Sequence, residues 1–593
     1  MSCVCCGTKA SRLPSFGLQH SPPWLLSFLF ALQHLLVLGS MLCTCHYLLL
    51  QSRPLAPTEQ SRLLASSLFA CGIATGLQST VGTRLPLVQT PTFELLIPAL
   101  TLSQHLAAER TPGNDTQGSP YCAGKDCDRP LSTQHLITQV SGAVLVSGAL
   151  QMVFGVSGLL GLILRRCGPM VKAPALFIIG LSSYKQAALF CSFSWVVSLL
   201  VILITGLLSQ TFRSCHLPIY LWNRKKGETK QYIPAMRMFS MFVPILCTWG
   251  VCSALRTVAE REGIAGAVRS AGNGSTSLAA NPFISFAVNG GNSTDPSAWF
   301  QIPSLGGWGW PQFTPLSVCV GVAMALTSSL TSFGCYLLCD RMVRCPSVPS
   351  QACNRGICME GVGNILSGLL GSVCGAGSSI PNIGMAGITQ VGSRHPVQLC
   401  ALLMVALGCS PKLAGLLMDI PFAVHGAVLC LTYSMALGGG ISYFQYADID
   451  SGRNVFIVGF TTFIALLVPR WLQAAPGILL TGWPPLDLLL MGLLCVPIFL
   501  GGLSSFLLDN TVSGSLRERG LLSGLAFGNP VPQDQAEELT HAYGLPFHHY
   551  CLFPAVYPCN QLCPRPLERL DPAEGEEDKL LKTALPVTGA ERG

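Results

Sequence analysis

Residues 24–50 read WLLSFLFALQHLLVLGSMLCTCHYLLL and contain no Asp, Glu, Lys or Arg. A helix rises about 1.5 Å per residue and the hydrocarbon core of a bilayer is about 30 Å thick, so about 20 apolar residues span it. Comparable apolar segments recur at 63–78, 87–102, 140–164, 187–208, 238–255, 316–338, 361–375, 397–417, 421–437, 455–468 and 486–508. Breaks near Pro174 and Pro381 predict two short spans in addition to these. The pattern predicts an all-α polytopic membrane protein with about 14 transmembrane segments.

The composition agrees with a membrane protein, because only 11% of the 593 residues are charged, against about 25% in soluble domains. The net charge of +7 does not indicate a nucleic-acid partner, since most of the cations lie in predicted loops. Three clusters decide the orientation by the positive-inside rule. They are Arg165 and Arg166; Arg224, Lys225 and Lys226; and Arg341, Arg344 and Arg355. A cytoplasmic N-terminus places all three inside, and the C-terminus is then cytoplasmic too.

The loops on the opposite side carry three N-glycosylation sequons, which begin at Asn114, Asn273 and Asn292. Their position predicts a glycoprotein of the plasma membrane. Cys122 and Cys127 share one of these outer loops, so they are candidates for a disulfide.

The chain divides at its longest outer loop. Residues 1–23 form a predicted N-terminal cytoplasmic tail, and 24–255 hold the first set of about seven spans. Residues 256–312 form the extracellular loop, 313–509 the second set of spans, and 510–593 a C-terminal cytoplasmic tail. An odd number of spans per set reverses the orientation of the second, so we expect two inverted repeats of seven.

Two matched segments interrupt the third span of each half. They are 82–95, GTRLPLVQTPTFEL, and 375–384, GAGSSIPNIG. Their prolines leave backbone carbonyls unpaired, and irregular backbone at membrane depth persists only where it is buried in protein or lines a cavity. One such segment alone favours a packing kink. A matched pair favours a substrate site between the two, as in transporters with inverted repeats.

The second segment also carries a motif, Pro381-Asn382-x-Gly384 followed by Thr389, which resembles the signature of the nucleobase–ascorbate transporter family (solute carrier family 23). Gln33 and His34 match that family's Gln-His pair in the first span. Further similar blocks occur at 84–89, 168–174 and 447–454. The resemblance runs from about residue 24 to 510 and is strongest to a divergent member of the ascorbate-transporter branch.

This resemblance implies 14 spans with a core domain of spans 1–4 and 8–11 and a gate domain of spans 5–7 and 12–14. It also implies short strands in spans 3 and 10, a homodimer and alternating access. The substrate-binding residues that it implies are Glu94, Leu95, Thr331, Ser379, Pro381 and Asn382. The site-supporting residues are Gln33, His34, Phe93, Cys335, Gly384 and Thr389. For Gln33 and His34, helix packing alone is the alternative interpretation.

The eighth span departs from the family pattern, because Thr331 and Cys335 stand where the family has a Glu and an Asp. Sodium prefers oxygen ligands and a proton needs a titratable carrier. The loss of both carboxylates therefore predicts sodium-independent transport.

Glu94 departs in the opposite sense, since an acid replaces a small residue in the third span, and Leu95 follows where many members have an aromatic residue. A carboxylate inside a membrane is costly and is therefore a functional candidate. One hypothesis is that Glu94 accepts N–H bonds from a purine. The alternative is that it pairs structurally with His34 or another polar group.

These features favour a transporter of purine nucleobases such as hypoxanthine or xanthine, by facilitation or exchange. Sodium-dependent ascorbate transport and a non-transporting regulatory role are the alternatives. The sequence has no Walker loop, no Gly-x-Ser-x-Gly elbow and no His-Glu-x-x-His motif, so we expect no enzyme, no metal and no cofactor. The expected partners are a small nucleobase, the bilayer and a second copy of the chain.

Overall fold

The computed structural model describes residues 16–18, 20–51, 55–108, 129–165, 167–223, 227–261, 297–372, 374–475, 478–479, 481–520 and 542–544. The predicted glycosylation sites and the predicted disulfide fall outside these ranges. They are Asn114, Asn273, Asn292, Cys122 and Cys127. These predictions therefore stand as expectations from the sequence.

The described part of the first half is helical apart from three short strands. Its elements are α1 (Trp24–Leu50), α2 (Pro57–Thr80), β1 (Gln89–Thr90), α3 (Phe93–Ala108), α4 (Arg129–Ser157), α5 (Leu159–Arg165), α6 (Pro169–Ser182), α7 (Tyr184–Ser192), α8 (Trp195–Gly206), the π-helix η1 (Leu207–Thr211), β2 (Leu217–Asn223), β3 (Gly227–Ile233), α9 (Ala235–Met238) and α10 (Phe242–Arg261).

The second half repeats the pattern of long helices around one short strand. Its elements are α13 (Pro315–Val343), α14 (Ser350–Leu370), β4 (Gly377–Ser378), α15 (Ile380–Thr389), α16 (Arg394–Gly408), α17 (Pro411–Gly415), η2 (Leu416–Asp419), α18 (Phe422–Tyr443), η3 (Phe444–Tyr446), α19 (Gly452–Ala474), α20 (Pro484–Leu494) and α21 (Pro497–Thr511).

The all-α polytopic class is confirmed. Within the described ranges, seven helices are individually long and apolar enough to cross a membrane, and the number reaches nine if each of two bent pairs is one span. Shorter apolar helices cover Trp195–Thr211 and Phe242–Val258. The predicted total of about 14 spans remains a prediction, because it counts these short helices and the interrupted spans as well.

The predicted strands in spans 3 and 10 are present as β1 and β4, each followed at once by a helix, α3 and α15. The sequence did not predict the hairpin of β2 and β3, which pair antiparallel over seven residues each. Its strands contain the aromatic and β-branched residues typical of β-structure. They lie between the apolar segments 187–208 and 238–255, so a prediction based on apolar segments did not cover them.

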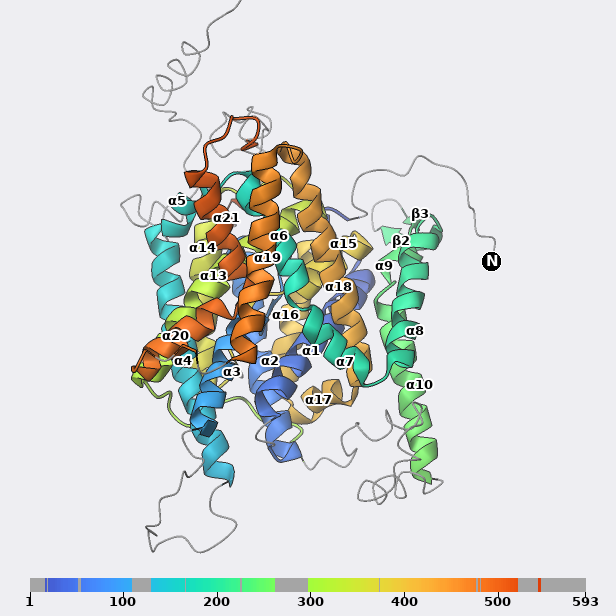
Figure 1. Ribbon diagram of the computed structural model, residues 1–593. Coiled ribbons are helices and arrows are strands. Elements are labelled where there is room, and N and C mark those ends of the chain that lie inside the picture. The colour runs from blue at the N-terminus through green and yellow to red at the C-terminus, as the bar shows by residue number, and fades with distance from the viewer. Residues whose placement is uncertain are drawn as a thin grey trace, which may run out of the picture.

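Helices from the two halves of the chain pack together. α14 packs on α4 and α2, and α16 packs on α2. On the other side α18 packs on α6, α7 and α8, while α21 packs on α6 and α19. Figure 1 shows α8 and α10 at the edge of this bundle, with the β2–β3 hairpin at one end of them. The division into core and gate domains that the resemblance implies remains a prediction.

One predicted segment was misplaced. The sequence predicted a span at 361–375 and left Arg355 in a loop. Instead α14 begins at Ser350, and Arg355 and Glu360 are buried within it, each 1% exposed. A window of apolar residues stops at charged side chains, whereas a helix continues through them when partners inside the protein satisfy the charges.

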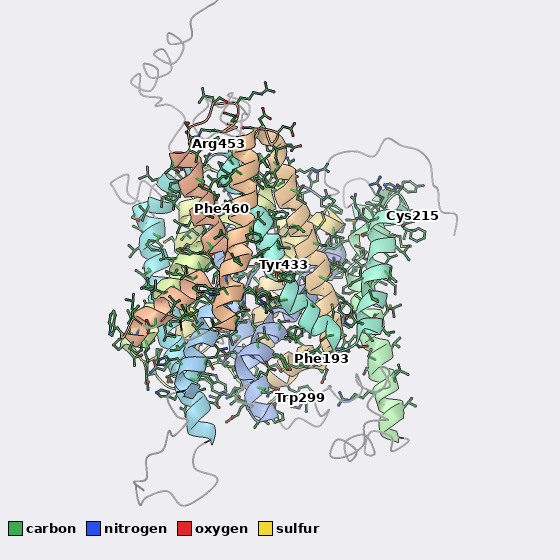
Figure 2. All side chains as sticks on the ribbon, in the orientation of Figure 1. Phe193, Cys215, Trp299, Tyr433, Arg453 and Phe460 are labelled. Atoms are coloured by element: carbon green, nitrogen blue, oxygen red, sulfur yellow. The ribbon has the colours of Figure 1, made fainter. Side chains whose placement is uncertain are left out.

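A buried ion pair joins α19 to α21 at one end of the bundle. Arg453 donates to the Asp509 carboxylate at 2.9 Å, and Arg517 lies 3.6 Å from Asp448. Figure 2 places Arg453 and Trp299 at opposite ends of the bundle. This is the separation expected of a residue predicted to be cytoplasmic and one predicted to be extracellular.

Candidate functional site

The two interrupted segments meet, as the sequence predicts. β1 and β4 pair antiparallel, with Gln89 opposite Ser378. Side chains from neighbouring helices hold the start of each strand: Thr75 Oγ1 accepts from the Gln89 amide at 2.9 Å, and Asn364 Oδ1 accepts from the Ala376 amide at 2.7 Å. Buried backbone amides need partners, so α2 and α14 fix the crossing point that β1 and β4 form.

Ser379, two residues before the family motif, caps the N-terminus of α15. Ser379 Oγ accepts from the Asn382 backbone amide at 3.4 Å and from Asn382 Nδ2 at 2.9 Å. Asn382 Oδ1 lies 3.1 Å from His34 Nδ1 on α1. Pro381 occupies the first turn, where a missing N–H costs no helical bond. The motif therefore ties α15 to α1, and both ends of the Asn382 amide are engaged.

Glu94 lies in the first turn of α3 and is only 2% exposed. Within the described part of the chain, its Oε2 has no hydrogen-bond partner. Thr327 Oγ1 donates to the Glu94 backbone carbonyl at 3.2 Å, which fixes the position of the turn. The Cys335 thiol and the Tyr433 hydroxyl lie within electrostatic range of the carboxylate. The structural alternative, pairing of Glu94 with His34 or another polar group, remains a prediction: His34 Nδ1 bonds Asn382, and the Thr92 side chain lies close to the Glu94 carboxylate.

The two departures on α13 are both satisfied inside the protein. The Thr331 hydroxyl donates to the Thr327 carbonyl of its own helix at 3.1 Å. The Cys335 thiol donates to the Ser378 carbonyl of β4 at 3.5 Å. Cys335 thus touches the crossing point, whereas the Thr331 hydroxyl faces its own helix.

Apolar and small residues complete the surroundings. Leu95 is fully buried in the main apolar cluster, and the Phe93 ring lies 6.2 Å from the Tyr433 ring. A Cβ on Gly384 would lie 2.2 Å from the Thr432 carbonyl oxygen, so the motif glycine permits α15 to approach α18 closely.

Two predicted site-supporting residues behave differently from each other. The Thr389 hydroxyl donates to the Met385 carbonyl within α15. Thr389 lies seven positions after Asn382, which places it about 10 Å further along the helix axis. Gln33 is buried on α1, and its Oε1 has no partner among the residues that the structure describes.

A carboxylate that the sequence analysis missed joins the two strands. Glu360 Oε1 on α14 accepts hydrogen bonds from Ser378 Oγ, from Tyr336 OH at 2.9 Å and from Gln89 Nε2 at 3.3 Å. Gln78 Nε2 on α2 donates to Tyr336 OH at 3.1 Å. This Glu360 network links α2, β1, α13, α14 and β4 around one buried acid.

A sequence signal for Glu360 existed. Arg355 and Glu360 precede the apolar stretch 361–375 without a proline or a polar run between them. Extending the span towards its N-terminus would have placed an acid in the membrane, which is a functional candidate by default.

Four elements around the crossing point, α1, β1, α3 and α14, carry buried acceptors that have no partner among the described residues. Among these acceptors are Gln33 Oε1, Gln89 Oε1, Glu94 Oε2 and Glu360 Oε2. A buried oxygen without a partner is costly. N–H groups of a polar ligand at the crossing point would satisfy such oxygens.

Two interrupted helices that cross at a buried polar centre, within an apolar helical bundle, define a membrane permease. The model of the Permease family matches residues 26–474. Solute carrier family 23 member 3 of Mus musculus is 41% identical over 95% of this chain and 90% of its own length. Solute carrier family 23 member 1 of Rattus norvegicus is 34% identical over 90% of this chain and 85% of its own length. Nucleobase-ascorbate transporter 7 of Arabidopsis thaliana is 27% identical over 91% of this chain and 94% of its own length. The chain belongs to solute carrier family 23, the nucleobase–ascorbate transporters.

Proposed function

We propose that this chain transports purine nucleobases of the hypoxanthine or xanthine type by sodium-independent facilitation or exchange. The observation that carries the proposal is the unpaired Oε2 of Glu94 in the first turn of α3. A purine carries N–H groups for this oxygen and carbonyl oxygens for protein donors. It is also neutral, so it brings no charge that must be balanced inside the membrane.

An anionic substrate fits this centre less well. Glu94 lies in α3, which follows β1, and Glu360 lies in α14 and bonds Ser378 of β4; the Glu360 Oε1 partners given above are neutral groups. Ascorbate is an anion at neutral pH, and a buried anion needs a compensating charge, but no Lys or Arg is among the residues named above at this centre. This argument places a nucleobase above ascorbate as the substrate.

The sodium-independence rests on α13. Thr331 and Cys335 direct their polar hydrogens to protein carbonyls, and neither supplies the anionic oxygen that a sodium ion prefers. Glu360 is the observation that favours an ion-coupled alternative, because it is a buried acid beside both strands. A proton or a cation bound there would couple transport to an ion gradient.

The experiment is uptake of radiolabelled hypoxanthine and ascorbate in cells that express the chain, with sodium present and then replaced. The proposal predicts hypoxanthine uptake that survives sodium replacement. Sodium-dependent ascorbate uptake would overturn it. No uptake of either, with the chain at the cell surface, would favour the non-transporting alternative.

The proposal also covers the oligomeric state, the membrane and the orientation of the protein. We infer a homodimer formed through the gate domain, in the plasma membrane, with both termini in the cytoplasm. The separation of Arg453 from Trp299 along the bundle supports this orientation (Figure 2). Labelling of intact cells from outside tests the orientation, because only extracellular segments react. Cross-linking at the cell surface tests the homodimer.

A further inference from the structure

Far beyond the last helix, the short segment Ala542–Gly544 packs inside the bundle. Ala542 is 2% exposed and Tyr543 is 3% exposed, and both belong to the main apolar cluster. A tail residue loses its freedom on docking, and burial of a tyrosine ring offsets that loss. This segment therefore occupies a formed site on the protein.

Two buried arginines hold the backbone of the segment. Arg355 Nη2 on α14 donates to the Tyr543 carbonyl at 2.8 Å, and Arg394 Nη2 on α16 donates to the Ala542 carbonyl. The Tyr543 hydroxyl donates to the Pro346 carbonyl at 2.6 Å and lies 3.6 Å from Cys345 Sγ. We call these four partners, Cys345, Pro346, Arg355 and Arg394, the tail socket.

The tail socket is continuous with the substrate centre. Arg355 Nε donates to the Gly82 carbonyl at 2.7 Å, at the start of the interrupted segment that leads into β1. The same helix, α14, carries Glu360, whose carboxylate bonds Ser378 of β4. One arginine thus touches the tail, the approach to β1 and the helix that bears the central acid.

The chain that leads towards this segment is fixed elsewhere, at the ends of gate helices. Ser451 Oγ donates to the Glu518 carboxylate at 2.6 Å, and Asn454 Nδ2 donates to the Glu518 carbonyl at 2.7 Å. Hydrogen bonds from Ser451 and Ser515 lower the pKa of Glu518 to about 2, so it is ionised at neutral pH. The start of the tail is therefore tied to α19 while residues 542–543 are tied to α14 and α16.

We propose that Ala542–Gly544 is a latch that joins the C-terminal tail to the core domain and restrains the core against the gate. The occupant of the socket is this segment of the same chain. Alternating access needs the core to move relative to the gate, and a tail fastened to both limits that movement. Undocking the latch raises the fraction of molecules whose centre is open to the cytoplasm.

Two native cysteines report the two parts of this proposal. Cys345 lies in the tail socket, and burial raises the pKa of its thiol to about 12, which slows alkylation while Tyr543 covers it. Cys335 is fully buried at the crossing point. The experiment exposes the cytoplasmic side of full-length protein in inside-out vesicles to a membrane-impermeant maleimide, and mass spectrometry measures the alkylation rate at each cysteine.

The variant Tyr543→Ala removes the ring and its hydroxyl, and Tyr543→Phe removes the hydroxyl alone. Leu516→Ala, at the start of the same tail, is the matched control, because the Leu516 side chain is 53% exposed. In Tyr543→Ala we expect alkylation of Cys345 to rise roughly tenfold and that of Cys335 to rise about twofold or more. Tyr543→Phe gives a smaller rise at both, and Leu516→Ala gives none.

Equal Cys345 rates in wild type and both Tyr543 variants would overturn the docking of the tail. A rise at Cys345 with an unchanged rate at Cys335 would overturn the restraint on the core. Neither readout depends on which substrate the protein carries, and Tyr543→Phe keeps the test valid if Tyr543→Ala fails to fold.

Discussion

The two interrupted segments have the same plan, a two-residue strand followed by a helix, yet their polar groups are used differently. In β4–α15, Ser379 caps the helix, Asn382 bonds Ser379 and His34, and Gly384 packs on α18. In β1–α3, Glu94 occupies the first turn of the helix with an oxygen that has no partner among the described residues.

The difference separates a scaffold from a recognition surface. The motif that identifies the family holds α15 in place through contacts inside the protein. Under the proposed function, Glu94 Oε2, which has no partner among the described residues, is the atom that binds a ligand. Changes in the β4–α15 arm should therefore reduce folding and abundance, whereas changes at Glu94 should alter substrate recognition at normal abundance.

The largest effect is expected from Gly384→Val. Its side chain would enter the space of the Thr432 carbonyl, where even a Cβ lies 2.2 Å from the oxygen. Overpacking of this kind costs about 3 kcal/mol or more when backbone must move, so surface biotinylation should find little protein. Gly438→Val, on α18 with open space around its Cβ, is the control. Equal surface amounts of the two variants would contradict the scaffold role.

The next effect is that of Glu360→Gln. The substitution replaces a carboxyl oxygen of this network by an amide donor and so weakens the bonds from Ser378 and Tyr336, and we expect a loss of about 2 kcal/mol in stability. A fluorescence melting curve of the purified protein measures this loss. Tyr336→Phe should lose less, because it removes one donor and retains the acid. A Glu360→Gln melting curve that overlays wild type would mean that the Glu360 network does not hold the strands.

Glu94→Gln should spare the fold and weaken binding. Its Oε2 has no partner to lose within the described residues, so the melting curve should stay close to that of wild type. An amide replaces one acceptor by a donor, and half-saturation of hypoxanthine uptake should then need roughly tenfold more substrate. Unchanged affinity and rate would remove Glu94 from the site.

The smallest effect concerns the cap of α15. Ser379→Ala removes an N-cap and should cost about 1 kcal/mol. Ser410→Ala removes the cap of α17, where Ser410 accepts from Leu413, and is the matched control. Only the Ser379 variant should also reduce uptake, because only it loosens Asn382. A similar loss of uptake in both variants would count against a special role for this arm.

Much of this comparison was accessible from the sequence. The prolines and glycines of 82–95 and 375–384 predicted both interruptions, and β1 pairs with β4 as that prediction requires. Glu94 was recognised because an acid stands out in an apolar stretch. These features depend on local chemistry and on the length of apolar runs, which the sequence displays directly.

The remaining features depend on partners that are distant along the chain. Glu360 and Arg355 seemed to lie outside the membrane because the apolar window began after them. They are buried because Tyr336, Ser378, Gly82 and Tyr543 satisfy their charges. No window of neighbouring residues contains those partners, so local patterns could not supply the contacts.

The most direct test of the account is hypoxanthine exchange in proteoliposomes that contain the purified chain, with no sodium on either side. Vesicles preloaded with unlabelled hypoxanthine should take up labelled hypoxanthine faster than empty vesicles, and Glu94→Gln should reduce this exchange at low substrate concentration. Exchange that appears only when sodium or a proton gradient is supplied would contradict the account and would assign ion coupling to Glu360.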